Sequence, residues 1–181
     1  MGLKKPEKID QKYNENCGKI LILNLTLERT LNFFLANYFV HPQDYKTFVL
    51  EDFFVESNFE SRIRLFEDIS KREIDYYKNE IFNADLTRNI VSLMRQVKKK
   101  RNMIAHHSLI YYPETGITKL DRGKSITKEK DMIILDKKLV KEVEEKVQKL
   151  LKEINELRIK INQKRINEEK SSNTKVWKNK N

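Results

Sequence analysis

Apolar side chains recur at steps of three and four residues along four stretches of this chain, and this spacing constrains its fold more than any other feature. The stretches cover residues 18–40, 59–80, 86–107 and 137–169. Such spacing places the side chains on one face of an α-helix, where they can form a core. The 181 residues include only 4 glycines and 3 prolines, too few for a many-turned β-sandwich. We therefore predict an all-α fold, an up-and-down bundle of helices.

Local signals indicate where the first three helices end or begin. His41 ends the first helix, because the residue before a proline avoids the α region. A shorter helix is expected over residues 43–56. Either Ser57 or Asn58 is suited to cap the next helix, since both side chains can accept a hydrogen bond from a free backbone N–H. The polar residues 1–17 predict an arm that precedes the helical domain.

The chain changes character after the helix over residues 86–107, for which Asp85 is the expected cap. Residues 109–136 contain β-prone runs separated by turn-forming residues, which predicts a short β-hairpin or an extended flap before a long C-terminal helix. The helical domain is expected to cover residues 18–169. Residues 170–181 are rich in Lys, Asn and Ser, and we expect them to form a disordered basic tail.

The C-terminal helix carries its apolar residues in a heptad-like order. They are Val140, Val143, Val147, Leu150, Ile154, Leu157 and Ile161. Two interpretations fit this order, a coiled-coil seam between two copies of the chain and the core of a single helical bundle. Core packing is the commoner cause of such spacing.

The formal net charge of +10 suggests a polyanionic partner such as RNA, although a generally Lys-rich composition explains it equally well. The one cysteine, Cys17, excludes a disulfide within the chain. The polar N-terminal residues do not resemble a signal peptide, and no run of about 18 apolar residues suggests a membrane span. We therefore expect a cytoplasmic protein with no membrane partner.

Two polar residues, Asn24 and Glu28, fall on the apolar face of the first helix. A buried carboxylate is costly unless it is paired, so Glu28 is expected to meet an arginine or a hydroxyl group in the bundle. Such a pair would stabilise the fold or support a functional site. The alternative is that Glu28 lies at the edge of the apolar face and reaches water.

The densest group of chemically capable side chains lies at the end of the helix over residues 86–107. It consists of Lys98, Lys99, Lys100, Arg101, Asn102, His106 and His107. Asn102 is four residues from His106 and shares its helix face, so it can orient the imidazole. Arg101 is five residues from His106, so both can border one groove without touching each other. The chain has no cluster of metal-ligand spacing, and we expect neither metal nor cofactor.

RNA cleavage needs the two side-chain types found here. An imidazole, with an ordinary pKa of about 6.5, can take a proton from the ribose 2′-hydroxyl or give one to the leaving 5′-oxygen. A guanidinium can stabilise the negative charge that develops on the phosphoryl oxygens. Because each chain supplies one such pair, a homodimer with its twofold axis beside Arg101 and His106 would complete the site. The run Lys98–Lys100 is either a solvated face or a guide for the RNA backbone.

The sequence Arg101-Asn102-Met103-Ile104-Ala105-His106 resembles the R-x4-H signature of the HEPN superfamily, in its Arg-Asn-x-x-Ala-His variant. The resemblance covers roughly residues 18–165, and only the motif is sharp. It implies an all-helical fold, a homodimer with the motif at the interface, and metal-independent endoribonuclease activity that leaves 2′,3′-cyclic phosphate ends. Arg101 and His106 correspond to the catalytic pair and Asn102 to the supporting polar position. His107 lies outside the signature, and either contacts RNA or caps the helix.

Three hypotheses follow. The first is a ribonuclease toxin or antiviral defence effector, similar to the abortive-infection (AbiF-like) group of the family and restrained by an antitoxin protein or an inhibitory RNA. The second is a non-catalytic HEPN-like module that binds RNA or protein. The third is a structural helical protein that dimerises through residues 140–161, in which Arg101 is a surface cation and His106 a helix-end residue.

Overall fold

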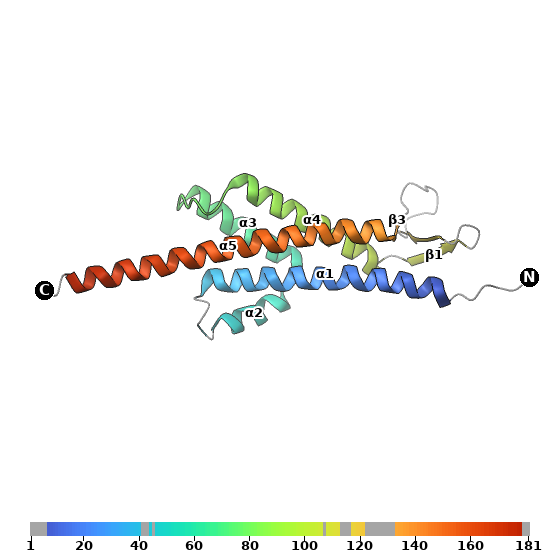
Figure 1. Ribbon diagram of the computed structural model, residues 1–181, viewed down its shortest axis with the longest axis horizontal. Coiled ribbons are helices and arrows are strands. Elements are labelled where there is room, and N and C mark those ends of the chain that lie inside the picture. The colour runs from blue at the N-terminus through green and yellow to red at the C-terminus, as the bar shows by residue number, and fades with distance from the viewer. Residues whose placement is uncertain are drawn as a thin grey trace, which may run out of the picture. The chain divides into compact units, whose positions relative to one another are not determined.

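The computed structural model describes residues 7–40, 44, 46–106, 108–112, 117–121 and 133–178, and the side chains of residues 13–105 and 135–171 within those ranges. Its helices are α1 (Glu7–Phe39), α2 (Lys46–Glu56), α3 (Phe59–Asp75), α4 (Ala84–His106) and α5 (Lys137–Lys178), coloured in chain order from blue to red in Figure 1. The described chain is thus mostly helical, which confirms the all-α class. The HEPN-type arrangement of the helices stays a prediction.

Three short strands lie between α4 and α5 in the described part of the chain. They are β1 (Ser108–Tyr112), β2 (Ile117–Asp121) and β3 (Ile133–Ile134). They form one antiparallel sheet in the order β1-β2-β3, with Ser108 opposite Asp121 and Tyr112 opposite Ile117. The strands fall on the β-prone segment, and its role as a flap stays a prediction.

The chain forms two compact units, and each is built from two separate stretches. The first unit combines Met1–Leu27 with Leu93–Lys149, and the second combines Glu28–Ser92 with Leu150–Asn181. Helices α1, α4 and α5 each contribute residues to both units. The domain limits predicted near residues 18 and 169 therefore fall inside helices.

In the second unit, α3 runs in the same direction as α1. The rings of Phe34 and Phe66 lie 5.3 Å apart, and further along both helices Tyr38 donates a hydrogen bond to Glu73. Phe34 and Phe66 are almost fully buried, so this contact belongs to the core of the unit. The apolar face of α3 thus packs as its spacing predicts.

The heptad-like residues of α5, from Val140 to Ile161, are all buried within the chain. Core packing, the commoner of the two interpretations, is therefore confirmed, and this face is not available as a seam between copies. Not every apolar residue of the predicted stretch 18–40 is buried. Leu21 is 36% exposed, whereas its neighbour Ile20 is fully buried. Adjacent helical residues point about 100° apart, which turns Leu21 away from the core.

Both long helices extend further than the sequence predicts. Helix α1 begins at Glu7, so the expected polar arm is wrong for residues 7–17. Helix α5 continues to Lys178, so the expected disordered tail is wrong for residues 170–178. Glu, Lys and Gln are strong helix formers, and extending a helix that already exists needs no new nucleation. Polar composition alone therefore did not mark either helix end.

One predicted cap is confirmed and the other is wrong. Asn58 caps α3, since its Oδ1 accepts a hydrogen bond of 2.9 Å from the Ser61 backbone N–H. The cap of α4 is Asn83 and not Asp85, because Asn83 Oδ1 accepts a hydrogen bond of 2.8 Å from the Asp85 backbone N–H. The Asp85 carboxylate instead pairs with Arg88 one turn along the helix. Asparagine precedes both helices at the position where capping is strongest.

Helix α3 ends at Asp75, five residues before the predicted end at residue 80. Lys78 has a φ of 50°, in the left-handed region, and the Asn79 N–H donates to the Glu73 carbonyl at 2.8 Å. A left-handed residue just past a helix is usually a glycine, and here it is a lysine. Tyr77 falls inside the predicted helical stretch 59–80 but beyond the end of α3, and it is 65% exposed.

Candidate active site

The R-x4-H motif occupies the last turns of α4, which ends at His106. Met103 is buried and anchors this turn in the first unit, whereas Arg101 and Asn102 are half-buried. The Arg101 guanidinium donates a hydrogen bond of 3.1 Å from Nη1 to Asn102 Oδ1. Among the described side chains, Asn102 is the hydrogen-bond partner of Arg101. Two of the three predicted catalytic residues, which are adjacent in the sequence, are therefore hydrogen-bonded to each other.

His106 is the last residue of α4, at the helix end where the macrodipole favours a protonated imidazole. Its imidazole lies outside the described side chains, and His107 lies outside the described residues. The predicted orientation of the imidazole by Asn102 therefore stays a prediction.

The three lysines before the motif differ in how far their side chains are exposed to solvent. Lys99 is exposed, whereas Lys98 and Lys100 are half-buried. The pKa of Glu142 on α5 is lowered, first by a hydrogen bond from Lys146 and then by the charge of Lys100. Lys100 thus lies close to an acid of its own chain. The RNA-binding role of the three lysines stays a prediction.

Glu28 has the arginine partner that its position on the apolar face predicts. Arg62 on α3 donates to Glu28 Oε2 at 2.5 Å and to Asn32 Oδ1 at 2.6 Å, and its guanidinium lies 5.4 Å from the centre of the Phe59 ring. The Arg62 side chain is only 5% exposed. All four residues belong to the second unit, whereas Arg101 belongs to the first. The pair therefore belongs to the interior of the second unit, and a supporting role of Glu28 for the motif stays a prediction.

Asn24, the other polar residue predicted on this face, is buried in the first unit. Its amide donates to the Ile20 carbonyl at 2.9 Å, and its Oδ1 has no donor among the described residues. A buried amide oxygen without a donor costs free energy. The predicted supporting role of Asn24 stays a prediction.

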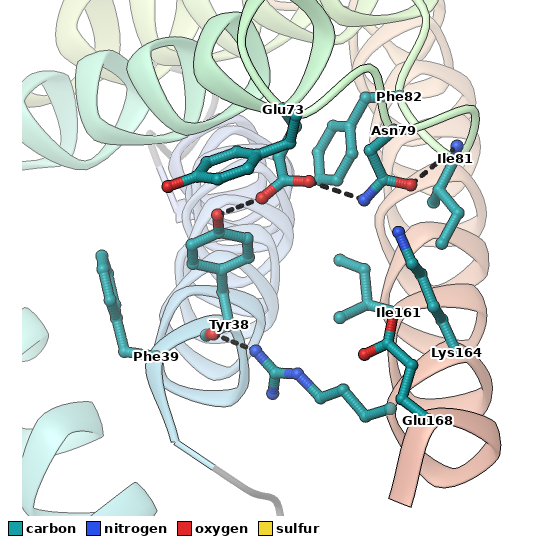
Figure 2. Close-up of a pocket in the computed structure, with 11 residues that line it drawn as sticks. Tyr38, Phe39, Glu73, Asn79, Ile81, Phe82, Ile161, Lys164 and Glu168 are labelled. Atoms are coloured by element: carbon teal, nitrogen blue, oxygen red, sulfur yellow. Dashed lines mark hydrogen bonds between the residues drawn. The ribbon is translucent and has the colours of Figure 1, made fainter. Parts of the chain in front are cut away.

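The second unit contains a cavity of about 360 Å³, between the ends of α1 and α3 and the surface of α5, that was not predicted from the sequence. Figure 2 shows the Tyr38 hydroxyl and the Asn79 amide pointing at the Glu73 carboxylate. Tyr38 donates to Glu73 Oε1 at 2.5 Å, and Asn79 Nδ2 donates to Oε2 at 2.6 Å. The sequence did contain a signal for this buried acid. Glu73 follows Phe66 and Ser70 at helical spacing, so it falls on the apolar face of α3. Glu28 occupies the same kind of position on α1.

Two further properties of the described residues bear on the kind of site. They contain no group of three or more His, Cys, Asp or Glu side chains that could hold a metal ion. None of the helices in the described ranges is long and apolar enough to cross a membrane.

Comparisons with protein-family models, with curated proteins and with solved structures found no match to this chain. The HEPN resemblance therefore rests on residues 101–106 and on the helical context of that motif.

Proposed function

We propose that this protein is a metal-independent endoribonuclease of the HEPN type that acts as a toxin or antiviral defence effector in the cytoplasm. The observation that carries the proposal is the Arg-Asn-x-x-Ala-His sequence in the last turns of α4, where Asn102 holds the half-buried guanidinium of Arg101. A fixed guanidinium is suited to charge that develops at one place, because it needs little reorganisation during the reaction.

In the proposed reaction the 2′-oxygen of a ribose attacks the adjacent phosphorus. One His106 imidazole accepts the proton of the 2′-hydroxyl, and a second, protonated His106 gives a proton to the 5′-oxygen as its bond to phosphorus breaks. The products are a 2′,3′-cyclic phosphate and a free 5′-hydroxyl. Arg101 stabilises the negative charge on the phosphoryl oxygens in the transition state.

Two histidines at one phosphate require two copies of the chain, and we propose a homodimer whose twofold axis passes beside the motif. The seven heptad-like residues of α5, between Val140 and Ile161, are buried within the chain, which supports a different surface for the dimer than the heptad face. In a cell the activity would be restrained by an antitoxin protein or an inhibitory RNA.

The test is cleavage of single-stranded RNA by the purified protein in the presence of EDTA. We expect cyclic phosphate ends from the wild type and cleavage reduced by at least about 100-fold in Arg101→Ala and His106→Ala, both of which should remain folded. Arg88→Ala is the matched control, because Arg88 lies on the same helix with a side chain that is 77% exposed. Expression of the wild type, and not of the two motif variants, should arrest bacterial growth.

Retention of full cleavage by Arg101→Ala would contradict the proposal. RNA binding without cleavage by the wild type would favour the second hypothesis, a non-catalytic binding module.

A further inference from the structure

The cavity shown in Figure 2 contains a buried carboxylate whose hydrogen-bond donors among the described residues are neutral. Glu73 is only 9% exposed. Burial, and then the hydrogen bond to Glu73, raise the pKa of Tyr38 well above its usual range, so its hydroxyl stays protonated and donates. A carboxylate can accept about four hydrogen bonds, and Tyr38 and Asn79 provide two of them. Glu73 can therefore accept further hydrogen bonds from a ligand.

Aromatic side chains stand at the rim of the same cavity. Tyr77 is 65% exposed and Phe39 is 52% exposed, and both line the hollow. Large exposed aromatic rings beside a cavity are suited to stacking on a planar ring of a ligand, because every such ring has two flat π faces.

Two cations from α5 line the cavity as well. The Arg165 guanidinium donates to the Asn37 carbonyl at 2.6 Å and to the Tyr38 carbonyl, which fixes it at the C-terminal end of α1. A guanidinium has five N–H groups, so three remain beyond these two bonds. Lys164 beside it is exposed, and Figure 2 shows its side chain at the α5 wall of the cavity. These groups can bind an anion.

The cavity is lined by two acids, Glu73 and Glu168, and by two cations, Lys164 and Arg165. A plain amine or a plain anion would pair with only one of these two sets and would leave the aromatic rings unused. A nucleotide has a planar base for the rings, base N–H groups for the carboxylate and a phosphate for the cations. The volume of about 360 Å³ lies at the lower end of the range for ligand cavities, which suits one nucleotide.

We propose that this cavity binds a single nucleotide, with guanine preferred because its adjacent N1–H and N2–H groups can both donate to the Glu73 carboxylate. Uracil presents one such N–H between two carbonyl oxygens and should bind more weakly. The nucleotide is either free or part of an RNA strand, and both sources share this chemistry. The proposal goes beyond the ribonuclease activity and does not depend on Arg101 or His106.

The test is calorimetric titration of the full-length protein with GMP, AMP, CMP, UMP and guanosine. We expect GMP to bind most tightly and UMP most weakly. Tyr77→Ala should weaken GMP and guanosine binding at least fivefold, about the loss expected for one stacked base. Lys164→Ala should weaken GMP about tenfold and guanosine hardly at all, because only GMP carries the phosphate.

The matched controls are Phe48→Ala and Lys160→Ala, since both residues are exposed and neither lines the cavity. Both should bind GMP as the wild type does. Glu73→Gln should lose the preference for GMP over UMP, with retention of the fold checked by circular dichroism. If Glu73→Gln fails to fold, the Tyr77→Ala and Lys164→Ala variants test the proposal instead, because both side chains are largely outside the core.

A single-stranded oligonucleotide ending in guanosine distinguishes the two sources. Equal affinity for GMP and the oligonucleotide supports a free nucleotide, and tighter, salt-sensitive binding of the oligonucleotide supports an RNA strand. The proposal is overturned if the folded protein binds no nucleotide at about 1 mM, if UMP binds as tightly as GMP, or if Tyr77→Ala and Lys164→Ala bind like the wild type. Arg101→Ala should keep GMP binding, which separates this proposal from the ribonuclease one.

Discussion

Two arginines of this chain, Arg62 and Arg101, have different surroundings. Arg62 is nearly fully buried, donates to the Glu28 carboxylate and to Asn32, and lies over an aromatic ring. Arg101 is half-buried, and among the described side chains it donates to a neutral amide, that of Asn102. The first guanidinium is neutralised by its own chain, whereas the second keeps its positive charge without a described acidic partner.

The difference indicates how the two charges are used. A buried guanidinium requires a fixed acid, so Arg62 and Glu28 stabilise the fold. A guanidinium held by a neutral side chain stays electropositive toward an incoming anion, which is what the proposed role of Arg101 requires. Substituting the first arginine should therefore affect stability, and substituting the second should affect activity.

The largest expected effect is on stability. Arg62→Ala should lower the free energy of unfolding by about 3–5 kcal/mol, because it leaves the Glu28 carboxylate partly buried and unpaired. Urea unfolding measures this loss. The control is Arg64→Ala on the same helix, whose side chain is 73% exposed and whose distance to the Glu60 carboxylate is 3.7 Å. That variant should change stability by less than about 0.5 kcal/mol, and equal losses in both would remove the distinction.

The second effect is on activity. Arg101→Ala should reduce RNA cleavage by about 10²–10³-fold, the usual cost of removing one group that stabilises transition-state charge. Its free energy of unfolding should stay within about 0.5 kcal/mol of the wild type. Cleavage rates and urea unfolding of the same samples provide both values. A loss of stability as large as that of Arg62→Ala, with cleavage retained, would show that Arg101 is structural.

The third effect concerns the positioning of Arg101. Asn102→Ala should lower kcat for RNA cleavage by about tenfold and leave KM unchanged, because the guanidinium loses its fixed direction and not its charge. Asn102→Asp keeps an accepting oxygen but neutralises Arg101 and repels the phosphate, so it should lower kcat at least as far as Asn102→Ala does. Asn102→Gln keeps a neutral accepting amide and should restore part of the lost kcat. Equal kcat values for Asn102→Gln and Asn102→Ala would argue against the hydrogen bond of 3.1 Å as the cause.

The smallest effect concerns an exposed pair, the opposite extreme from Arg62 and Glu28. The hydrogen bond from Lys146 lowers the pKa of Glu142, and the Glu142 side chain is 44% exposed. A lowered pKa stabilises the fold above the unfolded pKa of about 4.3, and this contribution is lost as pH falls through the folded pKa. Lys146→Met should therefore lower the free energy of unfolding by a few tenths of a kcal/mol at neutral pH and hardly at all in acid.

Thermal unfolding at several pH values measures this difference, and Lys152→Met, from a more loosely paired lysine 4.0 Å from Glu156, is the control. If the stability difference between Lys146→Met and the wild type grew toward low pH, the lowered pKa of Glu142 would not be its cause.

Features with a local cause could be predicted from the sequence. The burial of the α5 residues from Val140 to Ile161 follows from spacing, and the Asn58 cap follows from side-chain chemistry next to a helix. The position of the motif at the end of α4 was predicted for the same reason. Because a buried acid needs a partner, the sequence predicted an arginine or a hydroxyl group beside Glu28. It did not show that this partner is Arg62.

Features that depend on distant contacts could not be predicted. Tyr38 and Glu73 are separated by 35 positions in the chain, and their hydrogen bond exists only once α1 and α3 pack. The end of α3 depends on Lys78 in a left-handed conformation, which lysine adopts without a sequence signal. The twofold axis of the proposed active site is a property of two chains, so no pattern within one chain can locate it.

The interleaved assembly of the two units has a consequence during synthesis on the ribosome. The first unit needs residues up to Lys149 and the second needs residues beyond Leu150, so neither hydrophobic core can close before α5 emerges. Until then Leu27 in the first unit and Leu31 in the second belong to cores that still lack α5, and contacts between segments this far apart in the chain form slowly. The apolar faces of α1 and α4 therefore stay exposed until α5 has been translated, which favours binding of the nascent chain by chaperones.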